Sequence, residues 1–349
     1  MMIPDVIDYE NPFSLDTVRL PPERIIDRQE QVKFLNDRVI GHRENVLITG
    51  PYGVGKTCLL RKFRAGIPKD TAHQTLLIEM EMRRVTADPS DFLSDVLLKL
   101  IGSFWEQVLK RPYSELIKSV TSPADVREHI MPQVKTVLEL YRLVRPRSVT
   151  AAMEEHNALG FDKWVKATKE EKLSRTVTRG DLTPSEFVSL ANQLLLALAE
   201  NGISRTIIFG DEANHIDPDI ETEIIRRNFE VFSQQNVQFV LTARPEVVKA
   251  VPHLKDAFPA FLEVKPFDDS SVLDDLLQVY SSGRNTPSFS PQSRRLLWQV
   301  SRGNPTEIQR LCQTCVANAI SRARSGMTYE IDLDCVVAAM VQTYDFHPK

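Results

Sequence analysis

Residues 50–57 read GPYGVGKT and match the pattern G-x-x-x-x-G-K-[ST], which few chains of this length contain by chance. The chain holds only 13 glycines among 349 residues, yet three of them, at positions 50, 53 and 55, fall inside this segment. Glycines let successive backbone N–H groups curl around phosphate oxygens, and a helix that follows turns its N-terminus toward the anion. The pattern therefore predicts a strand–loop–helix unit that binds nucleotide phosphates. The alternative is a glycine-rich turn without a ligand.

The flanking residues favour a phosphate-binding loop. Residues 45–49 form a short apolar run that suits a buried strand, and residues 58–63 begin a helical pattern. Lys56 is expected to neutralise charge on the β and γ phosphates, and the Thr57 hydroxyl to ligate Mg²⁺. Cys58 is either a thiol with a lowered pKa at a helix N-terminus or a small residue packed under the loop. The expected nucleotide contacts in this segment are Gly50, Pro51, Tyr52, Gly53, Val54, Gly55, Lys56, Thr57 and Cys58.

A carboxylate that helps to hold the metal is expected at the end of a neighbouring buried strand. Residues 206–210 are such an apolar run, and Asp211 and Glu212 follow it directly. We expect Asp211 to hold Mg²⁺ through water and Glu212 to polarise the attacking water as a general base. Without the loop described above, the same pattern would equally fit an ordinary strand end.

The next strand pattern, residues 237–241, is followed by Thr242 and Arg244. A polar residue and an arginine at a strand end are suited to sense the γ-phosphate, since the attraction differs between ATP and ADP. The alternative for Arg244 is an ion-paired loop arginine. The chain has no Asn-Lys-x-Asp motif for guanine and no Leu-Ser-Gly-Gly signature. ATP is therefore expected rather than GTP, and a transporter-type ATPase is disfavoured.

Other segments alternate between strand and helix patterns. Residues 75–80 and 261–264 read as buried strands, and residues 92–109 read as a helix with an apolar face. Another helix begins at Thr183, an N-cap residue followed by proline and then by glutamate at the third helical position. This alternation predicts an α/β fold: a P-loop NTPase with a parallel five-stranded sheet and helices on both faces.

The C-terminal region reads as helical throughout. Asn304 and Pro305 form an N-cap and a first helical position, and the helix that follows carries Cys312 and Cys315 within its apolar stripe. Because no second cysteine pair exists, these two thiols are expected to pack in a core rather than to bind zinc.

Residues 110–182 form an insertion with 14 Lys or Arg against 10 Asp or Glu, in a chain whose net charge is −4. Five basic residues recur at every third position around Trp164, namely Lys163, Lys166, Lys169, Lys172 and Arg175. Steps of three slip by about 60° per step on an α-helix, so these charges wind around it. The insertion is then either a solvated helix or a contact surface for DNA or a protein partner.

The composition excludes several classes of protein. The longest nearly pure apolar run, residues 194–199, is far shorter than the roughly 18 residues of a membrane span, so no membrane association is expected. The first five residues lack the basic start and apolar stretch of a signal peptide. Four cysteines are too few for a disulfide framework. These observations predict a cytoplasmic protein in a reducing compartment.

Together these motifs resemble the AAA+/STAND-like P-loop ATPases, especially the origin-recognition-like, archaeal-type and transposition-regulator ATPases. Residues 11–13 and 26–30 look like the N-terminal motif of that family, which implies adenine contacts by Ile25 and Arg28. Thr242 and Arg244 are similar to the sensor of STAND proteins. Residues 303–305 are similar to the Gly-x-Pro motif, which implies that Pro305 lies against the adenine.

The resemblance also defines the parts of the chain. They are an N-terminal strap with an adenine-side helix (1–44), a P-loop ATPase α/β core with a helical insertion (45–268, insertion 110–182) and a helical lid (269–349). Two arginines of the family are missing. Thr306 stands where a second sensor arginine is usual, and residues 255–258 carry no arginine finger. Arg226 and Arg227 are the candidates to act instead, from a neighbouring subunit.

The leading hypothesis is a molecular switch that binds and hydrolyses ATP with Mg²⁺, with Lys56, Glu212, Thr242 and Arg244 as the catalytic residues. It would act through a protein partner, self-assembly or DNA, in transposition, defence or DNA maintenance by family resemblance. One alternative is a nucleotide-stabilised interaction module with little or no hydrolysis, which the two missing arginines favour. Another is a sequence-nonspecific DNA binder that uses the insertion at 110–182.

Overall fold

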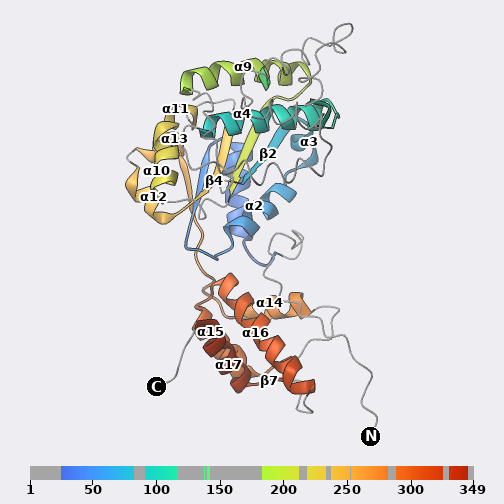
Figure 1. Cartoon of the computed structure of the whole chain (residues 1–349), viewed down its shortest axis with the longest axis vertical. Helices are drawn as coiled ribbons and strands as arrows, with labels where there is room; N and C mark the ends of the chain where they lie inside the picture. Colours follow the sequence, from blue (N-terminus) through green and yellow to red (C-terminus); the bar gives the residue numbers. More distant parts are fainter. Residues whose placement is uncertain are drawn as a thin grey trace, which may run out of the picture. The chain divides into compact units, whose positions relative to one another are not determined.

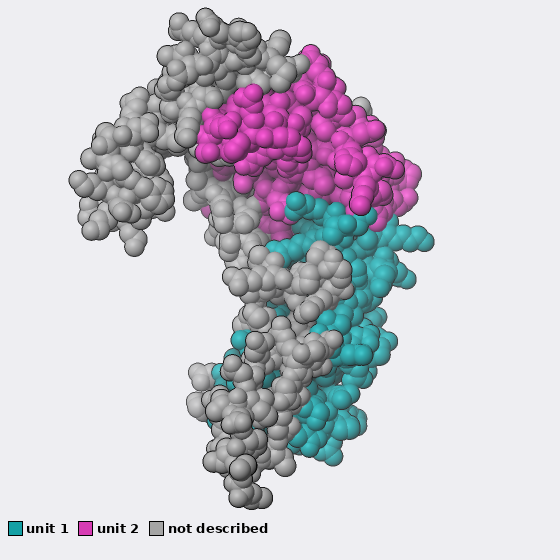
Figure 2. All heavy atoms as spheres, turned by 90° about the vertical axis from the view of Figure 1, so that its right-hand side faces the viewer, with its two compact units in different colours: residues 1–35, 49–66, 262–349 teal, residues 36–48, 67–261 magenta. Residues whose placement is uncertain are grey.

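The computed structural model describes residues 25–81, 91–112, 114–116, 137, 140–141, 183–211, 218–232, 237–251, 253–281, 288–324 and 330–344. The chain divides into two compact units (Figure 2). We call residues 36–48 and 67–261 the sheet unit, and residues 1–35, 49–66 and 262–349 the loop–lid unit. The predicted strap at residues 11–22 lies outside the described residues, as do Trp164 and the basic repeat around it.

A five-stranded sheet is the framework of the fold. Its strands, in the order in which they lie side by side, are β2 (Thr75–Glu81), β3 (Arg205–Asp211), β4 (Val237–Ala243), β1 (Val46–Thr49) and β5 (Ala260–Glu263). β3 runs parallel to both of its neighbours, and Ile208 lies between Ile78 and Phe239. β1 and β4 are buried along their whole length, as expected of strands that helices cover on both faces. The predicted parallel five-stranded sheet is confirmed.

Helices cover the sheet within its unit. Those preceding β3 are η3 (Asn36–Gly41), α3 (Lys69–His73), α4 (Asp91–Ser103), η5 (Phe104–Val108) and α9 (Pro184–Glu200). Those following it are α10 (Pro218–Arg227), α11 (Phe229–Phe232), α12 (Pro245–Ala250) and α13 (Leu254–Ala257). α4 and α9 lie side by side and pack together, and α4 also packs on β2 (Figure 1). Their apolar stripes meet in a core that includes Phe92, Trp105, Phe187 and Phe232.

Two of these helices bear directly on the sequence predictions. α9 begins with the predicted capping box, in which the Glu186 N–H donates to Thr183 Oγ1 (3.3 Å) and the Thr183 N–H donates to Glu186 Oε2 (2.9 Å). The predicted helix at 92–109 is α4 followed by the π-helical turn η5. Apolar periodicity does not separate these two forms, because η5 is only five residues long, about one turn.

The helices of the loop–lid unit are α1 (Gln29–Leu35), α2 (Lys56–Ala65), α14 (Ser271–Ser281), α15 (Pro291–Ser301), α16 (Pro305–Arg324) and α17 (Leu333–Tyr344). α15, α16 and α17 pack on one another around a separate core. Cys312, Cys315 and Cys335 are buried in that core, and burial raises the pKa of the Cys315 thiol to about 12. The described residues contain no group of three or more metal-ligating side chains. The burial of Cys312 and Cys315 in this core confirms their predicted core role.

The lid is not wholly α-helical. β6 (Ser288–Phe289) pairs in parallel with β7 (Glu330–Ile331), which joins the segments before α15 and α17. The sequence prediction of an all-α region missed this pair, because strands of two residues are too short to produce a periodic pattern. No helix in the described part of the chain is long and apolar enough to cross a bilayer.

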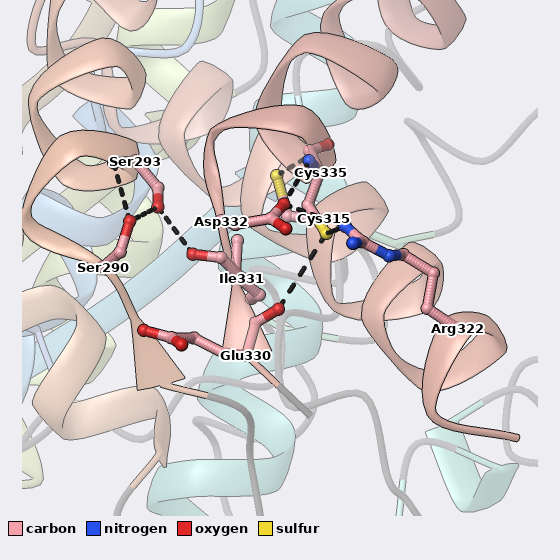
Figure 3. Close-up of polar contacts among 8 residues, drawn as sticks. All are labelled: Ser290, Ser293, Cys315, Arg322, Glu330, Ile331, Asp332 and Cys335. Atoms are coloured by element: carbon pink, nitrogen blue, oxygen red, sulfur yellow. Dashed lines mark hydrogen bonds and ion pairs between the residues drawn. The ribbon is translucent and has the colours of Figure 1, made fainter. Parts of the chain in front are cut away.

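A polar cluster fixes the start of α17 beside β7 (Figure 3). Asp332 Oδ1 accepts hydrogen bonds from the Cys335 N–H (2.9 Å) and from Arg322 Nη1 (2.8 Å). The same guanidinium nitrogen lies 3.0 Å from Cys335 Sγ. Asp332 is thus the N-cap residue of α17. Its hydrogen bond from Arg322 lowers the pKa of its carboxyl group from 3.8 to about 2.

We expect Asp332→Ala to lower the free energy of unfolding by about 1 kcal/mol through loss of the cap, and Asp332→Asn to lower it less because asparagine also caps. The folded pKa of Asp332 lies below its ordinary value, so the stabilisation is present above about pH 4 and is lost as the pH falls toward 2. Urea unfolding should therefore show the gap between wild type and Asp332→Asn closing from pH 5 to pH 2.5. A gap that stays constant would contradict this assignment.

Candidate functional site

The glycine-rich loop between β1 and α2 has a backbone that other residues cannot adopt. Gly50, Gly53 and Gly55 have φ values of 146°, 80° and 92°, all in the region that favours glycine. A Cβ atom on Gly50 would lie 2.2 Å from the Val264 carbonyl oxygen, and one on Gly53 would lie 2.8 Å from Asn304 Oδ1. The backbone at Val264 and the residues at the start of α16 therefore approach this loop too closely for any side chain at positions 50 and 53.

The five carbonyl groups from Gly50 to Val54 all accept hydrogen bonds from side chains. The first two are held by Lys56, whose Nζ donates to the carbonyl of Gly50 (2.7 Å) and to that of Pro51 (2.9 Å). Lys56 is buried in the first turn of α2. The predicted phosphate-binding lysine is thus held within the loop itself.

Arg28 holds the last of the five carbonyls. Its Nη2 donates to the carbonyl oxygens of Val54 (3.1 Å) and Lys265 (2.9 Å). Its guanidinium carbon Cζ lies over the Phe267 ring, 4.3 Å from the ring centroid. Arg28 is 5% exposed, and burial is the main cause of the lowered pKa of its guanidinium. Arginine nonetheless stays charged in proteins. The residue predicted to contact adenine is therefore built into the support of the loop.

The two central carbonyls are held by the start of α16. Asn304 Nδ2 donates to the Tyr52 oxygen (3.0 Å). Thr306 donates twice to the Gly53 oxygen, from Oγ1 (3.0 Å) and from its backbone N–H (3.2 Å). In the sequence, Thr306 stands out only because an arginine is usual at its position. In the structure, it holds the Gly53 carbonyl oxygen.

These contacts determine what the loop can bind. In a planar trans peptide the carbonyl and the N–H point in opposite directions. Where Asn304 and Thr306 hold the carbonyls of Tyr52 and Gly53, the N–H groups of the same two peptides point away from these two side chains. A row of such N–H groups before a helix N-terminus is a binding site for an anion, and phosphate fits it.

The remaining predicted nucleotide contacts surround the same loop. Ile25 is buried, and its carbonyl accepts a hydrogen bond from Lys62 Nζ of α2 (2.8 Å). Thr57 and Cys58 are partly buried in the first turn of α2, and Pro305 is partly buried in the first turn of α16. Tyr52 is 66% exposed. Their contacts with adenine, phosphate or Mg²⁺ stay predictions.

The sheet unit holds a second group of predicted residues, at the ends of β3 and β4. Gly210 pairs with Leu241, so Asp211 and Thr242 follow on adjacent strands. Thr242 Oγ1 donates to Asp211 Oδ1 (3.2 Å). This hydrogen bond orients the carboxylate predicted to hold Mg²⁺ through water, a role for which oxygen ligands are suited. Glu212, the predicted general base, lies outside the described residues.

Arg244 is paired with a glutamate that the sequence analysis missed. Glu221 of α10 accepts the Arg244 N–H at Oε1 (3.1 Å), and its Oε2 lies 3.8 Å from Arg244 Nε. Glu221 is 2% exposed and the Arg244 side chain 21%. Ile224 and Ile225, three and four residues further along, are also buried. That helical spacing could have placed Glu221 on the buried face of α10.

The structure also places the two arginines suggested as substitutes for the missing finger. Arg226 and Arg227 are exposed on α10, and both pair with Glu223 of the same helix. Hydrogen bonding by Arg227 is the main cause of the lowered pKa of Glu223. Any action on a neighbouring subunit stays a prediction.

Comparison with solved structures identifies the fold. The Aeropyrum pernix ORC1 protein in complex with DNA is 14% identical; the match covers 95% of this chain and 69% of that one, with a TM-score of 0.52. The match to the Drosophila ORC bound to DNA has 12% identity, 99% and 68% coverage and a TM-score of 0.48. The first of these shows the predicted AAA+ P-loop ATPase fold with its C-terminal helical region. No protein-family model matches the chain, and no curated protein matches it in sequence.

We expect Glu221→Ala to lower the free energy of unfolding by about 2 kcal/mol, because it leaves the partly buried Arg244 without its carboxylate. Glu246→Ala, at an exposed position of α12, is the matched control and should change stability by less than about 0.5 kcal/mol. Urea unfolding followed by circular dichroism measures both. Equal effects of the two substitutions would show that Glu221 does not support Arg244.

Proposed function

We propose that this chain, which has the AAA+ P-loop ATPase fold of the origin-recognition protein it resembles in structure, is an ATP-binding and ATP-hydrolysing molecular switch. It acts through a protein partner, self-assembly or DNA. The observation that supports this most strongly is the anchored loop: five successive carbonyls, from Gly50 to Val54, are held by side chains. This leaves the backbone N–H groups to bind the phosphates of ATP.

The strand order agrees with the choice of the proposed metal ligands. The loop follows β1, Asp211 ends β3, and β4 lies between these two strands in the sheet. Ligands of parallel α/β sheets bind at the carboxyl ends of the strands. Thr57 would ligate Mg²⁺ directly and Asp211 through water, and when bound the metal would neutralise charge on the phosphates. Both side chains carry the oxygen atoms that Mg²⁺ prefers.

Hydrolysis requires a water held in line with the γ-phosphate. Glu212 follows Asp211 in the chain and would accept a proton from that water. Thr242 keeps Asp211 in place through its hydrogen bond, and Glu221 holds Arg244 at the end of β4. Arg244 would supply positive charge near the γ-phosphate, which is the difference between ATP and ADP that a switch must sense.

The output of the switch rests on fold analogy and charge. The similar ORC1 protein was determined in complex with DNA. In this chain the insertion at 110–182 has 14 basic against 10 acidic residues and would provide the contact with DNA or with a protein partner.

A second candidate is a nucleotide-stabilised interaction module with little hydrolysis. Thr306 favours it, because it stands at the position of a sensor arginine and donates to the Gly53 carbonyl instead. Transfer of a phosphoryl group is usually accelerated by an arginine that stabilises its charge.

Phosphate release by the purified protein with ATP and Mg²⁺, with and without duplex DNA, separates these candidates. We expect turnover above that of Glu212→Gln, because glutamine cannot accept the proton, and none with Lys56→Ala, which removes the phosphate-binding charge. The exposed Lys69→Ala is the matched control and should be unaffected. Stimulation by DNA would support a DNA-acting switch. Turnover equal to that of Glu212→Gln under both conditions would contradict the ATPase and favour the interaction module.

A further inference from the structure

We infer that Asn304 and Thr306 of the lid are positioning residues that set the affinity of the loop for nucleotide phosphates. They do so by holding the carbonyls of Tyr52 and Gly53 from the start of α16. This inference rests on the proposed function, since it concerns the same nucleotide site. It assigns the lid a direct role in forming that site.

Asn304 performs two tasks with one side chain. Its Oδ1 accepts the N–H groups of Thr306 (3.1 Å) and Glu307 (3.4 Å), which caps α16. Its Nδ2 donates to the Tyr52 carbonyl (3.0 Å). Because the amide is planar, the direction of its N–H bonds is fixed once the oxygen caps the helix. The start of α16 and the middle of the loop are therefore held by a single rigid group.

Thr306 adds a second point of attachment one residue further along the loop. Its hydroxyl donates to the Gly53 carbonyl, and its backbone N–H is shared between that carbonyl and Asn304 Oδ1. The two segments are also in close packing contact, since a Cβ atom on Gly53 would lie 2.9 Å from Thr306 Cβ. Both carbonyls of Tyr52 and Gly53 are thus fixed by atoms of one helix end.

The orientation of these two carbonyls decides where the adjacent N–H groups point. The Tyr52 carbonyl and the Gly53 N–H belong to one planar peptide, and the Gly53 carbonyl and the Val54 N–H belong to the next. Fixing the two carbonyls on Asn304 and Thr306 directs both N–H groups away from these two residues. A loop with its donors already in place loses less conformational entropy when a phosphate binds.

The lid core holds α16 rigidly behind these contacts. Ile308, Leu311 and Cys312 are buried between α16 and its neighbours. The residue before Asn304 is also held in place, because the Gly303 carbonyl accepts a hydrogen bond from the Phe267 N–H (2.9 Å). A partner that shifts α16 would turn the two loop peptides with it. Phosphate affinity and the position of α16 are therefore coupled, and the coupling acts in both directions.

The decisive variant is Thr306→Val, which keeps the volume and the backbone N–H and removes only the hydroxyl. We expect the Kd values for ATP and for ADP to rise by the same factor, about fivefold to tenfold, which is the usual worth of one such hydrogen bond. Adenosine has no phosphate, so its Kd should not change. Competition against a fluorescent ADP analogue measures all three. Thr306→Ser restores the hydroxyl and should bind as wild type does.

Two further variants separate positioning from stability. Asn304→Ser still caps α16 but is too short to reach the Tyr52 carbonyl, so it should weaken ATP and ADP in the same way. Thr314→Val is the matched control, because the Thr314 hydroxyl bonds within α16, to the Arg310 carbonyl (3.1 Å), and it should leave all three Kd values unchanged. The melting temperature of each variant is measured alongside.

The outcomes are distinct. If wild type binds ATP and both Thr306→Val and Asn304→Ser bind it equally well, the inference is wrong and the proposed nucleotide site stands. If the variants weaken adenosine as much as ATP, or lose affinity only in proportion to a lower melting temperature, the two residues have a general structural role and the inference is again overturned. If wild type itself binds no nucleotide, the proposed function fails, and the inference with it.

Discussion

The nucleotide site depends on which groups bind the carbonyl oxygens of the glycine-rich loop. Turned inward, these oxygens would repel a phosphate. Lys56 donates hydrogen bonds to two of them, Arg28 to one, and Asn304 and Thr306 to the other two. With its carbonyls held in this way, the loop can offer its backbone N–H groups to an anion. The close approach of α16 also explains why position 53 must be glycine.

The same device recurs in the sheet unit, where Asp211 and Arg244, two described residues assigned to the chemistry, each have a neighbouring partner. Thr242 orients Asp211, and Glu221 holds both the backbone and the guanidinium of Arg244. Such support keeps side chains in one geometry before any ligand arrives, which is what electrostatic catalysis requires.

Local patterns in the sequence predicted the strands, the loop at 50–57 and the helix start at Thr183, because each depends on residues a few positions apart. They could not predict that Thr306 holds Gly53, because the two lie 253 positions apart and no pattern of apolar residues encodes the contact. Glu221 was missed because an acidic residue on a helix is read as exposed unless its buried neighbours are considered. Glu212 and most of the insertion lie outside the described residues.

We propose that the loop is already arranged for phosphate before nucleotide binds. The most direct test is a pair of crystal structures, one of the free protein and one with Mg²⁺ and a non-hydrolysable ATP analogue. We predict that the carbonyls of residues 50–54 keep the same partners in both and that the phosphates bind the N–H groups of the loop. A free loop with its carbonyls turned inward, or an analogue bound elsewhere on the chain, would contradict the account.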